Sequence, residues 1–239
     1  ITPHLTEGAS GRFSQRTMEL VVADPKSPQL NWIAQTESVG PEDLEVFALY
    51  NVFDQGALRV HVHAGALVPL GGIDSSDETM DPRDPGASIT EVQLPYQQQL
   101  GSGTFGLLPG FTANIQNDVA SLGLQARGVI RLGENDRGWA LGDMFQASLW
   151  AAYLVSDWAS VSMGARYSAW GNVEGFDQVL TTSTDLAYDS PVYNSLQAGS
   201  RVEIPLGLNF FLTEGRFAGH RVGVELLAPI HQSLDYVQL

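Results

Sequence analysis

Residues 157–170 read DWASVSMGARYSAW, and they show the rule that most of this chain follows. Every second position from Val161 to Ala169 is apolar, and small or polar residues occupy the positions between them. Successive side chains of an extended strand point to opposite faces, so a period of two predicts one apolar face and one polar face. The stretch therefore indicates a β-strand whose two faces meet different surroundings.

The same alternation recurs along the chain. Its clearest further segments cover residues 44–53, 58–68, 105–115, 121–132, 145–155, 201–212 and 221–230, and a less regular one covers 12–22. These segments run to roughly 10 to 13 residues, near the length that a tilted membrane strand needs and about twice the usual soluble length. Short turns alternate with long connections, which cover 71–102, 133–142 and 172–195. The pattern predicts an all-β fold, a transmembrane antiparallel up-and-down β-barrel with short periplasmic turns and long acidic outer loops.

The two ends of the chain are less regular. Residues 1–10 and 24–43 lack the period of two and are predicted to be loops. A strand in hydrocarbon must pair both of its edges, and eight clear strands with one doubtful strand do not complete that closure. We expect residues 1–239 to form a single barrel domain that lacks strands at one or both ends, with about 12 strands in the complete protein. The start does not look like a signal peptide, so the chain is expected to be mature or trimmed.

Composition narrows the classes of function. The net charge of -15 argues against nucleic acid as a partner, because phosphate binding calls for a basic surface. The absence of cysteine excludes disulfides, thiolate metal sites and covalent haem attachment. Lys26 is the only lysine, whereas soluble β-proteins usually protect their wet faces and edges with lysine. These observations favour an outer-membrane location, with membrane lipid and lipopolysaccharide as neighbours.

The polar faces of the predicted strands carry most of the arginines. Together with Glu45, the residues predicted to line the lumen are Arg59, His61, His63, Gln125, Arg127, Arg131, Arg166, Arg201, Glu203, Arg221 and Glu225. Arginines on neighbouring walls would attract anions and set the selectivity of a pore. The alternative is a ladder of ion pairs that fills a narrow barrel, because buried charges are tolerated when they are paired.

Other candidate chemistry is weak. No nucleophile elbow, phosphate-binding loop or zinc-protease motif occurs, so neither an enzyme nor a cofactor is expected. His61 and His63 have a spacing that can chelate a metal, but no third ligand is evident. Asp74, Asp77, Asp81 and Asp84 are candidates for binding Ca²⁺, although they lack the spacing of an EF-hand loop and a solvated acidic loop is the simpler interpretation. No metal is therefore predicted.

A family resemblance rests on several short motifs. They are LGSGTFGLLPG at residues 100–110, RLGEN at 131–135, LVSDW at 154–158, WG at 170–171 and AGHR at 218–221. Together they resemble the outer-membrane family named for a putative meta-pathway of phenol degradation, over roughly residues 44–235. The resemblance implies a channel-like protein of poorly defined cargo and carries over no catalytic residue. Residues 24–40 look like an insertion relative to that family.

Three hypotheses of function follow. The first is a channel-like outer-membrane protein for passive passage of a small solute, aromatic, hydrophobic or anionic, with residues 71–102 acting as a lid or constriction. The second is a structural outer-membrane barrel that anchors or surrounds a partner protein. The third is a soluble lipocalin-like binder, in which the apolar faces would point inward.

Overall fold

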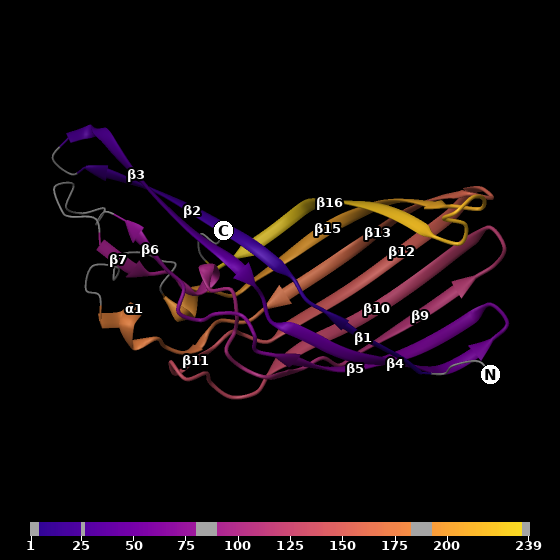
Figure 1. Ribbon diagram of the computed structural model, residues 1–239, viewed down its shortest axis with the longest axis horizontal. Helices are drawn as coiled ribbons and strands as arrows, with labels where there is room; N and C mark the ends of the chain where they lie inside the picture. Colours follow the sequence, from indigo (N-terminus) through magenta and orange to yellow (C-terminus); the bar gives the residue numbers. More distant parts are fainter. Residues whose placement is uncertain (1–4, 25–26, 80–89, 183–192, 236–239) are drawn as a thin grey trace.

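A large antiparallel sheet dominates the computed structural model, which describes residues 5–24, 27–79, 90–182 and 193–235 (Figure 1). Apart from β8 and β9, which both lie between β5 and β10, each strand of the sheet pairs with the next sheet strand along the chain, so the order is up-and-down. Its ten strands are β1 (Leu5–Ser10), β4 (Leu44–Gln55), β5 (Leu58–Val68), β8 (Gly106–Leu107), β9 (Gly110–Gln116), β10 (Ala120–Arg131), β12 (Met144–Ser156), β13 (Ala159–Trp170), β15 (Gly199–Phe211) and β16 (Arg221–Leu234). The all-β class and the long alternating strands are confirmed.

Strands β8 and β9 are two halves of one strand that lies between β5 and β10. The break falls at Leu108 and Pro109, because proline has no N–H to donate to the ladder. The neighbours still bond across the break, since Leu108 N donates to Gly65 O at 2.9 Å and Gly128 N donates to Pro109 O at 2.8 Å. Leu108 turns to the inner side and is buried against Leu67 and Val129.

The two faces of the sheet are exposed to different degrees. Apolar side chains on one face are open, as Leu149 (50 % exposed), Met163 (62 %) and Leu208 (48 %) show. On the opposite face Ser168 and Glu203 are only 6 % and 8 % exposed. A soluble sheet normally buries its apolar face, so this arrangement is inverted. The face that carries the arginines is the covered one, and we call it the inner face.

The N-terminal part differs from its prediction. Loops were expected over residues 1–10 and 24–43, but Leu5–Ser10 forms β1, which pairs with β4, and Ser27–Pro41 forms β3, which pairs with β2 (Phe13–Asp24). The β2–β3 hairpin lies beyond the main sheet (Figure 1) and contributes no strand to it. The described inner positions of β3 are small or polar, including the buried Thr36 and Ser38, and Met18 of β2 lies opposite Thr36. The irregular strand predicted over residues 12–22 is confirmed by β2, whereas the loop predicted over 24–43 is wrong, because residues 27–41 pair with β2 as β3. Residues 35–41 of β3 show no apolar period that would have revealed the strand.

The connections at the two ends of the sheet are of different kinds. Short turns gather at one end and the long connections at the other, as Figure 1 shows. We call the long connections, residues 69–105, 132–143 and 171–198, the cap. The cap contains β6 (Ser76–Thr79), β7 (Thr90–Gln93), η1 (Tyr96–Gln98), β11 (Trp139–Ala140), β14 (Glu174–Gly175), α1 (Gln178–Thr182) and η3 (Asn194–Leu196). It has an apolar core of its own, formed by Tyr96, Trp139, Val173 and Leu180.

Strands β1 and β16 are the two edges of the sheet. No pairing among the described residues joins them, and both strands are exposed along nearly their whole length on both faces. The structure therefore contains a curved antiparallel wall with two open edges, consistent with part of a barrel. Within the described part of the chain, no helix is long and apolar enough to cross a membrane.

Candidate functional site

A polar cavity of about 590 Å³ lies on the inner face, next to the cap. Its charged lining residues are the arginines Arg12, Arg16, Arg127, Arg131, Arg166 and Arg201 and the carboxylates Glu42, Asp43, Glu45 and Glu203. Six of the eleven arginines of an acidic chain thus surround one space, with two positive charges in surplus over the carboxylates. We call this space the arginine cavity.

Curvature of the sheet brings distant strands together around the cavity. Arg127 on β10 reaches Glu45 on β4 at 3.2 Å, although β5 and β9 lie between these two strands in the sheet. On the other side Arg166 on β13 reaches Glu225 on β16 at 3.3 Å, across the intervening β15. Such pairs can form only where the inner face is concave.

Strand register sets the inner side chains in rows. Arg127 lies opposite Gln146, Gln146 opposite Ser168, and Ser168 opposite Arg201, so one polar row crosses four neighbouring strands. The row on the cap side of it is apolar, because Val129 lies opposite Met144 and Met144 opposite Trp170. The cavity wall therefore has a charged band beside an apolar band.

Asp43 ties the cap to the sheet. Its carboxylate accepts hydrogen bonds from Gly71 N at 3.1 Å, Ser102 N at 2.9 Å and Ser102 Oγ at 2.5 Å. Arg131 is the nearest cation, with its Nη1 at 3.9 Å from Asp43 Oδ2. Asp43 is thus satisfied by the cap and makes no close hydrogen bond to Arg131.

The N-terminal hairpin supplies a second set of charges that sequence analysis missed. Arg16 donates to Glu42 Oε1 at 2.6 Å and to the carbonyl oxygens of Gln97 and Gln99 at 2.9 and 2.8 Å. Burial would raise the pKa of the Glu42 carboxyl, but hydrogen bonds from Ser14 and Arg16 outweigh burial and hold that pKa below its ordinary value. Arg12, Ser14 and Arg16 recur at every second position, which is the polar signal that could have revealed them.

The predicted lumen residues are only partly brought together. Arg127, Arg131, Arg166, Arg201 and Glu203 line the arginine cavity, as does Glu45. The other predicted residues lie on the strands outside this lining: Arg59, His61, His63, Gln125, Arg221 and Glu225. Several of them have local partners that account for their positions.

Arg59 and Arg221 both lie near the short turns, away from the cavity. Arg59 Nε lies 3.4 Å from Asp54 Oδ1, and the Arg221 guanidinium lies 4.4 Å from the centre of the Phe211 ring. The two residues are therefore not part of the cavity lining, and their assignment to the lumen stays a prediction.

The remaining predicted residues occupy the inner face between the turns and the cavity. Gln125 Nε2 donates to Thr112 Oγ1 at 2.9 Å, and the His63 ring packs at 5.2 Å from the Phe47 ring. His61 lies opposite Thr112 in the ladder. These contacts join side chains of neighbouring strands, and they do not bring the predicted residues together around one point.

The candidate metal ligands are divided by the limits of the described chain. Asp77 accepts hydrogen bonds from Glu37 N and Glu78 N, both at 2.8 Å, so its carboxylate is occupied by backbone donors. Asp74 is described as well, whereas Asp81 and Asp84 lie outside the described residues. Among residues that the structure describes, no three histidine or carboxylate side chains converge in a way that could hold a metal ion.

The three cap segments are locked to one another. Asp177, with its side chain 1 % exposed, accepts hydrogen bonds from Arg137 Nε and Gln93 Nε2, both at 2.7 Å. Burial would raise the pKa of the Asp177 carboxyl, but these hydrogen bonds outweigh burial and hold it below its ordinary value. The Tyr96 hydroxyl accepts from Asp177 N at 2.9 Å, and its ring packs edge-on against Trp139. Asp177, in the connection 171–198, is thus paired with a cation from another connection, Arg137 of residues 132–143.

Residues 71–102, predicted to be a lid or constriction, do reach the arginine cavity. Gln99, Leu100, Gly101 and Ser102 form part of its lining. Gln98 exchanges hydrogen bonds with Thr36 of the hairpin, at 2.9 and 3.2 Å. This part of the connection is therefore held in place over one end of the cavity.

Two aromatic side chains of the inner face lie across from glycines on both neighbouring strands. Phe47 lies opposite Gly8 and Gly65, and Trp150 lies opposite Gly123 and Gly164. A Cβ atom added at Gly123 would lie only 2.1 Å from Trp150 Cζ2. The indole therefore rests flat on the bare backbone of β10, which only glycine allows.

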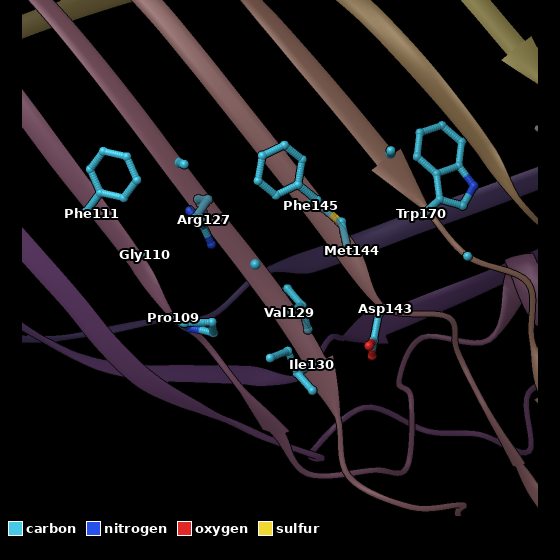
Figure 2. A pocket seen from close by; sticks show the side chains of 14 residues that line it. Pro109, Gly110, Phe111, Arg127, Val129, Ile130, Asp143, Met144, Phe145 and Trp170 are labelled. Carbon is cyan, nitrogen blue, oxygen red and sulfur yellow. The ribbon is translucent and has the colours of Figure 1, made fainter.

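A second hollow, of about 620 Å³, lies on the exposed apolar face (Figure 2). Phe111 and Phe145 stand at its sides (Figure 2). The small residues Ala126 and Gly128 of β10 also line it, and they lie opposite Phe111 and Phe145, respectively, in the strand register. Asp143 is its one acidic lining residue, and Asp143 Oδ1 accepts a hydrogen bond from Arg131 N at 2.8 Å. The lining of the hollow is mainly apolar, and Arg127, Val129, Met144 and Trp170 line both this hollow and the arginine cavity.

No protein-family model matches the chain, and no curated protein matches it either. The resemblance to the phenol meta-pathway family of outer-membrane proteins therefore stays a prediction.

Proposed function

We propose that this chain forms the wall of an outer-membrane β-barrel through which small anionic solutes pass passively. The observation that carries the proposal is the inverted sheet, with its apolar face open and its arginine-bearing face covered. Hydrocarbon is the solvent that such an exterior suits, and a polar interior is what a water-filled passage needs.

Aromatic side chains at both ends of the exposed face support a membrane location. Near the short turns, Tyr153 and Trp158 are each 55 % exposed, and Trp158 stacks on Phe210 at 6.1 Å. Near the cap, Phe105 and Phe145 are 57 % and 48 % exposed. Rings of this kind are enriched where a barrel crosses the two membrane interfaces. Closure of the barrel, which hydrocarbon requires, is part of this proposal.

The charge of the arginine cavity supports an anionic solute. Its guanidinium groups outnumber its carboxylates in a chain whose net charge is -15. A ring of arginines at a narrow point lowers the electrostatic barrier for anions and raises it for cations. The apolar and aromatic side chains beside the charged row, such as Trp170, also suit a solute with a hydrophobic part.

The second hypothesis, a structural barrel that anchors a partner protein, has one observation in its favour. The cap is packed around its own core and covers one end of the cavity, so it resembles a fixed closure as much as a gate. The lipocalin-like hypothesis requires apolar side chains on the inner face, and the orientation of the sheet argues against it.

Single-channel recording in planar lipid bilayers tests the proposal. The full chain should give current steps with a reversal potential that indicates anion preference under a salt gradient. Replacing Arg127 and Arg201 with Ala removes two charges from the polar row and should shift the reversal potential toward cations. Arg216→Ala removes one positive charge from an exposed turn and should leave the reversal potential unchanged, whereas Arg127→Ala and Arg201→Ala should each shift it when tested singly. Absence of any current step would refute the channel and favour the structural barrel.

A further inference from the structure

We propose that the arginine cavity contains a specific binding site for small monocarboxylates with a compact apolar body, with Arg131 as its principal ligand. The proposal rests on the proposed function, since it names the class of solute that would occupy the cavity. It goes beyond a general preference for anions, because it assigns separate residues to the two halves of one molecule.

Arg131 carries the first part of the argument. Its side chain is only 16 % exposed, and its Nε and Nη1 atoms are buried without a hydrogen-bond partner. Its nearest carboxylate is that of Asp43, at 3.9 Å, and Asp43 already accepts three hydrogen bonds from Gly71 and Ser102. A buried guanidinium with unused donors is costly, and an oxyanion that entered the cavity would remove that cost.

Other arginines of the same cavity are incompletely satisfied in the same way. The Nε atoms of Arg166 and Arg201 are buried and have no hydrogen-bond partner. Arg201 lies 3.4 Å from Glu203, but this pair does not have hydrogen-bond geometry. Arg16, by contrast, uses its donors on Glu42 and on two carbonyl groups of the cap. Arg131, Arg166 and Arg201, which carry these unused donors, are all on the sheet wall and line the cavity.

The apolar row supplies the second half of the site. Val129 lies two residues before Arg131 on the same face of β10, about 6.8 Å along the strand. Met144 lies opposite Val129, and Trp170 lies opposite Met144, so apolar surface extends sideways from Val129, one inner position away from Arg131. Leu141 of the cap also lines this part of the cavity. A ligand held by its carboxylate at Arg131 would lay its apolar body along this row.

Desolvation favours a monovalent ligand. The cavity contains Glu42, Asp43, Glu45 and Glu203, which leave a surplus of two positive charges to attract an anion. A multivalent anion such as phosphate would lose more hydration beside the apolar row than a monocarboxylate, whose apolar body suits that row. A planar carboxylate matches the flat guanidinium group and keeps only one charge.

Isothermal titration calorimetry on the full chain in detergent micelles tests the site at constant ionic strength and pH 7. The probes are cyclohexanecarboxylate, acetate, cyclohexylammonium and inorganic phosphate, and protein-free micelles correct for partitioning. Cyclohexanecarboxylate should bind at least tenfold more tightly than each of the other three. Equal or tighter binding of phosphate, or binding no different from that of empty micelles, would overturn the proposal.

Variants separate the two halves of the site. Arg131→Met should weaken binding of cyclohexanecarboxylate by about ten- to a hundredfold, the effect expected for loss of a charge-assisted hydrogen bond. Arg131→Lys keeps the charge without the planar group and should show a smaller loss. Met144→Ser should weaken cyclohexanecarboxylate and leave acetate unchanged. Arg59→Met is the control, because Arg59 pairs with Asp54 near the short turns and should have no effect.

Each result bears on one proposal separately. If Arg131→Met does not fold, the Arg131→Lys and Met144→Ser variants still decide, and wild-type affinity in both would refute the site. Anion-selective current without carboxylate binding would reject the binding site and keep the channel. Carboxylate binding without current would keep the site and reject the channel.

Discussion

The contact between Trp150 and Gly123 gives a sharp test of how the sheet is packed. Trp150 projects from β12 onto the inner face, and its indole lies over Gly123 of β10. A Cβ atom at Gly123 would come within 2.2 Å of two indole atoms, far below any real contact, so Gly123→Ala must displace the ring.

The magnitude follows from two opposing effects. Overpacking of a well-fitted side chain costs about 1–3 kcal/mol. Replacing glycine with alanine stabilises by about 0.4–1 kcal/mol, because it reduces the conformational entropy of the unfolded chain. We therefore expect Gly123→Ala to lower the free energy of unfolding by roughly 1–2 kcal/mol.

Gly128 provides a matched control on the same strand. A Cβ atom there would lie 3.5 Å from Met144 O and 3.6 Å from Pro109 Cγ, which are ordinary contacts. Gly128→Ala should therefore be neutral or slightly stabilising, although its effect on the unfolded chain is the same as that of Gly123→Ala.

Urea unfolding in detergent micelles, followed by circular dichroism, measures both variants and completes a double-mutant cycle with Trp150→Ala. The penalty of Gly123→Ala should disappear when Trp150 is absent, which would give a coupling energy of about 1–3 kcal/mol. Equal stabilities of Gly123→Ala and Gly128→Ala, or a penalty that persists without the indole, would refute the packing described here.

Two further predictions concern the cap. Gly101→Ala would place its Cβ 2.2 Å from Gly71 O, a backbone atom that cannot move aside, so unfolding experiments should show a loss of about 1–3 kcal/mol. Gly72→Ala, whose nearest neighbour would be a side-chain oxygen at 3.5 Å, should show little change. The lowered pKa of Asp177 means that its stabilising effect is present above the ordinary carboxyl pKa of about 4 and is lost as the pH falls below it. Near-ultraviolet circular dichroism should thus be constant from pH 7 to about pH 5 and change in stronger acid. Loss of the signal above pH 5 would contradict this role of Asp177. The same holds for an Asp177→Asn variant that keeps Arg137 ordered and shows an unchanged acid transition.

The period of two predicted most of the main sheet. Strands such as β12, β13 and β15 match their predicted ranges closely, because one face of each is apolar and the other is polar. In the β2–β3 hairpin, β2 was predicted as an irregular strand and β3 was not, since residues 35–41 of β3 show no apolar period. Local sequence reports the surroundings of a strand, and a strand with no apolar face leaves no such signal.

The sequence by itself determined that this protein is all-β, that its long strands have one apolar and one polar face, and that the polar face carries the arginines. Only the tertiary structure decided which arginines act together. Arg127 and Glu45 lie 3.2 Å apart because the sheet curves, whereas Arg59 and Arg221 lie near the short turns with other partners. Alternation fixes which face a side chain occupies, but register and curvature fix its height and its neighbours across the interior, and these depend on every strand at once.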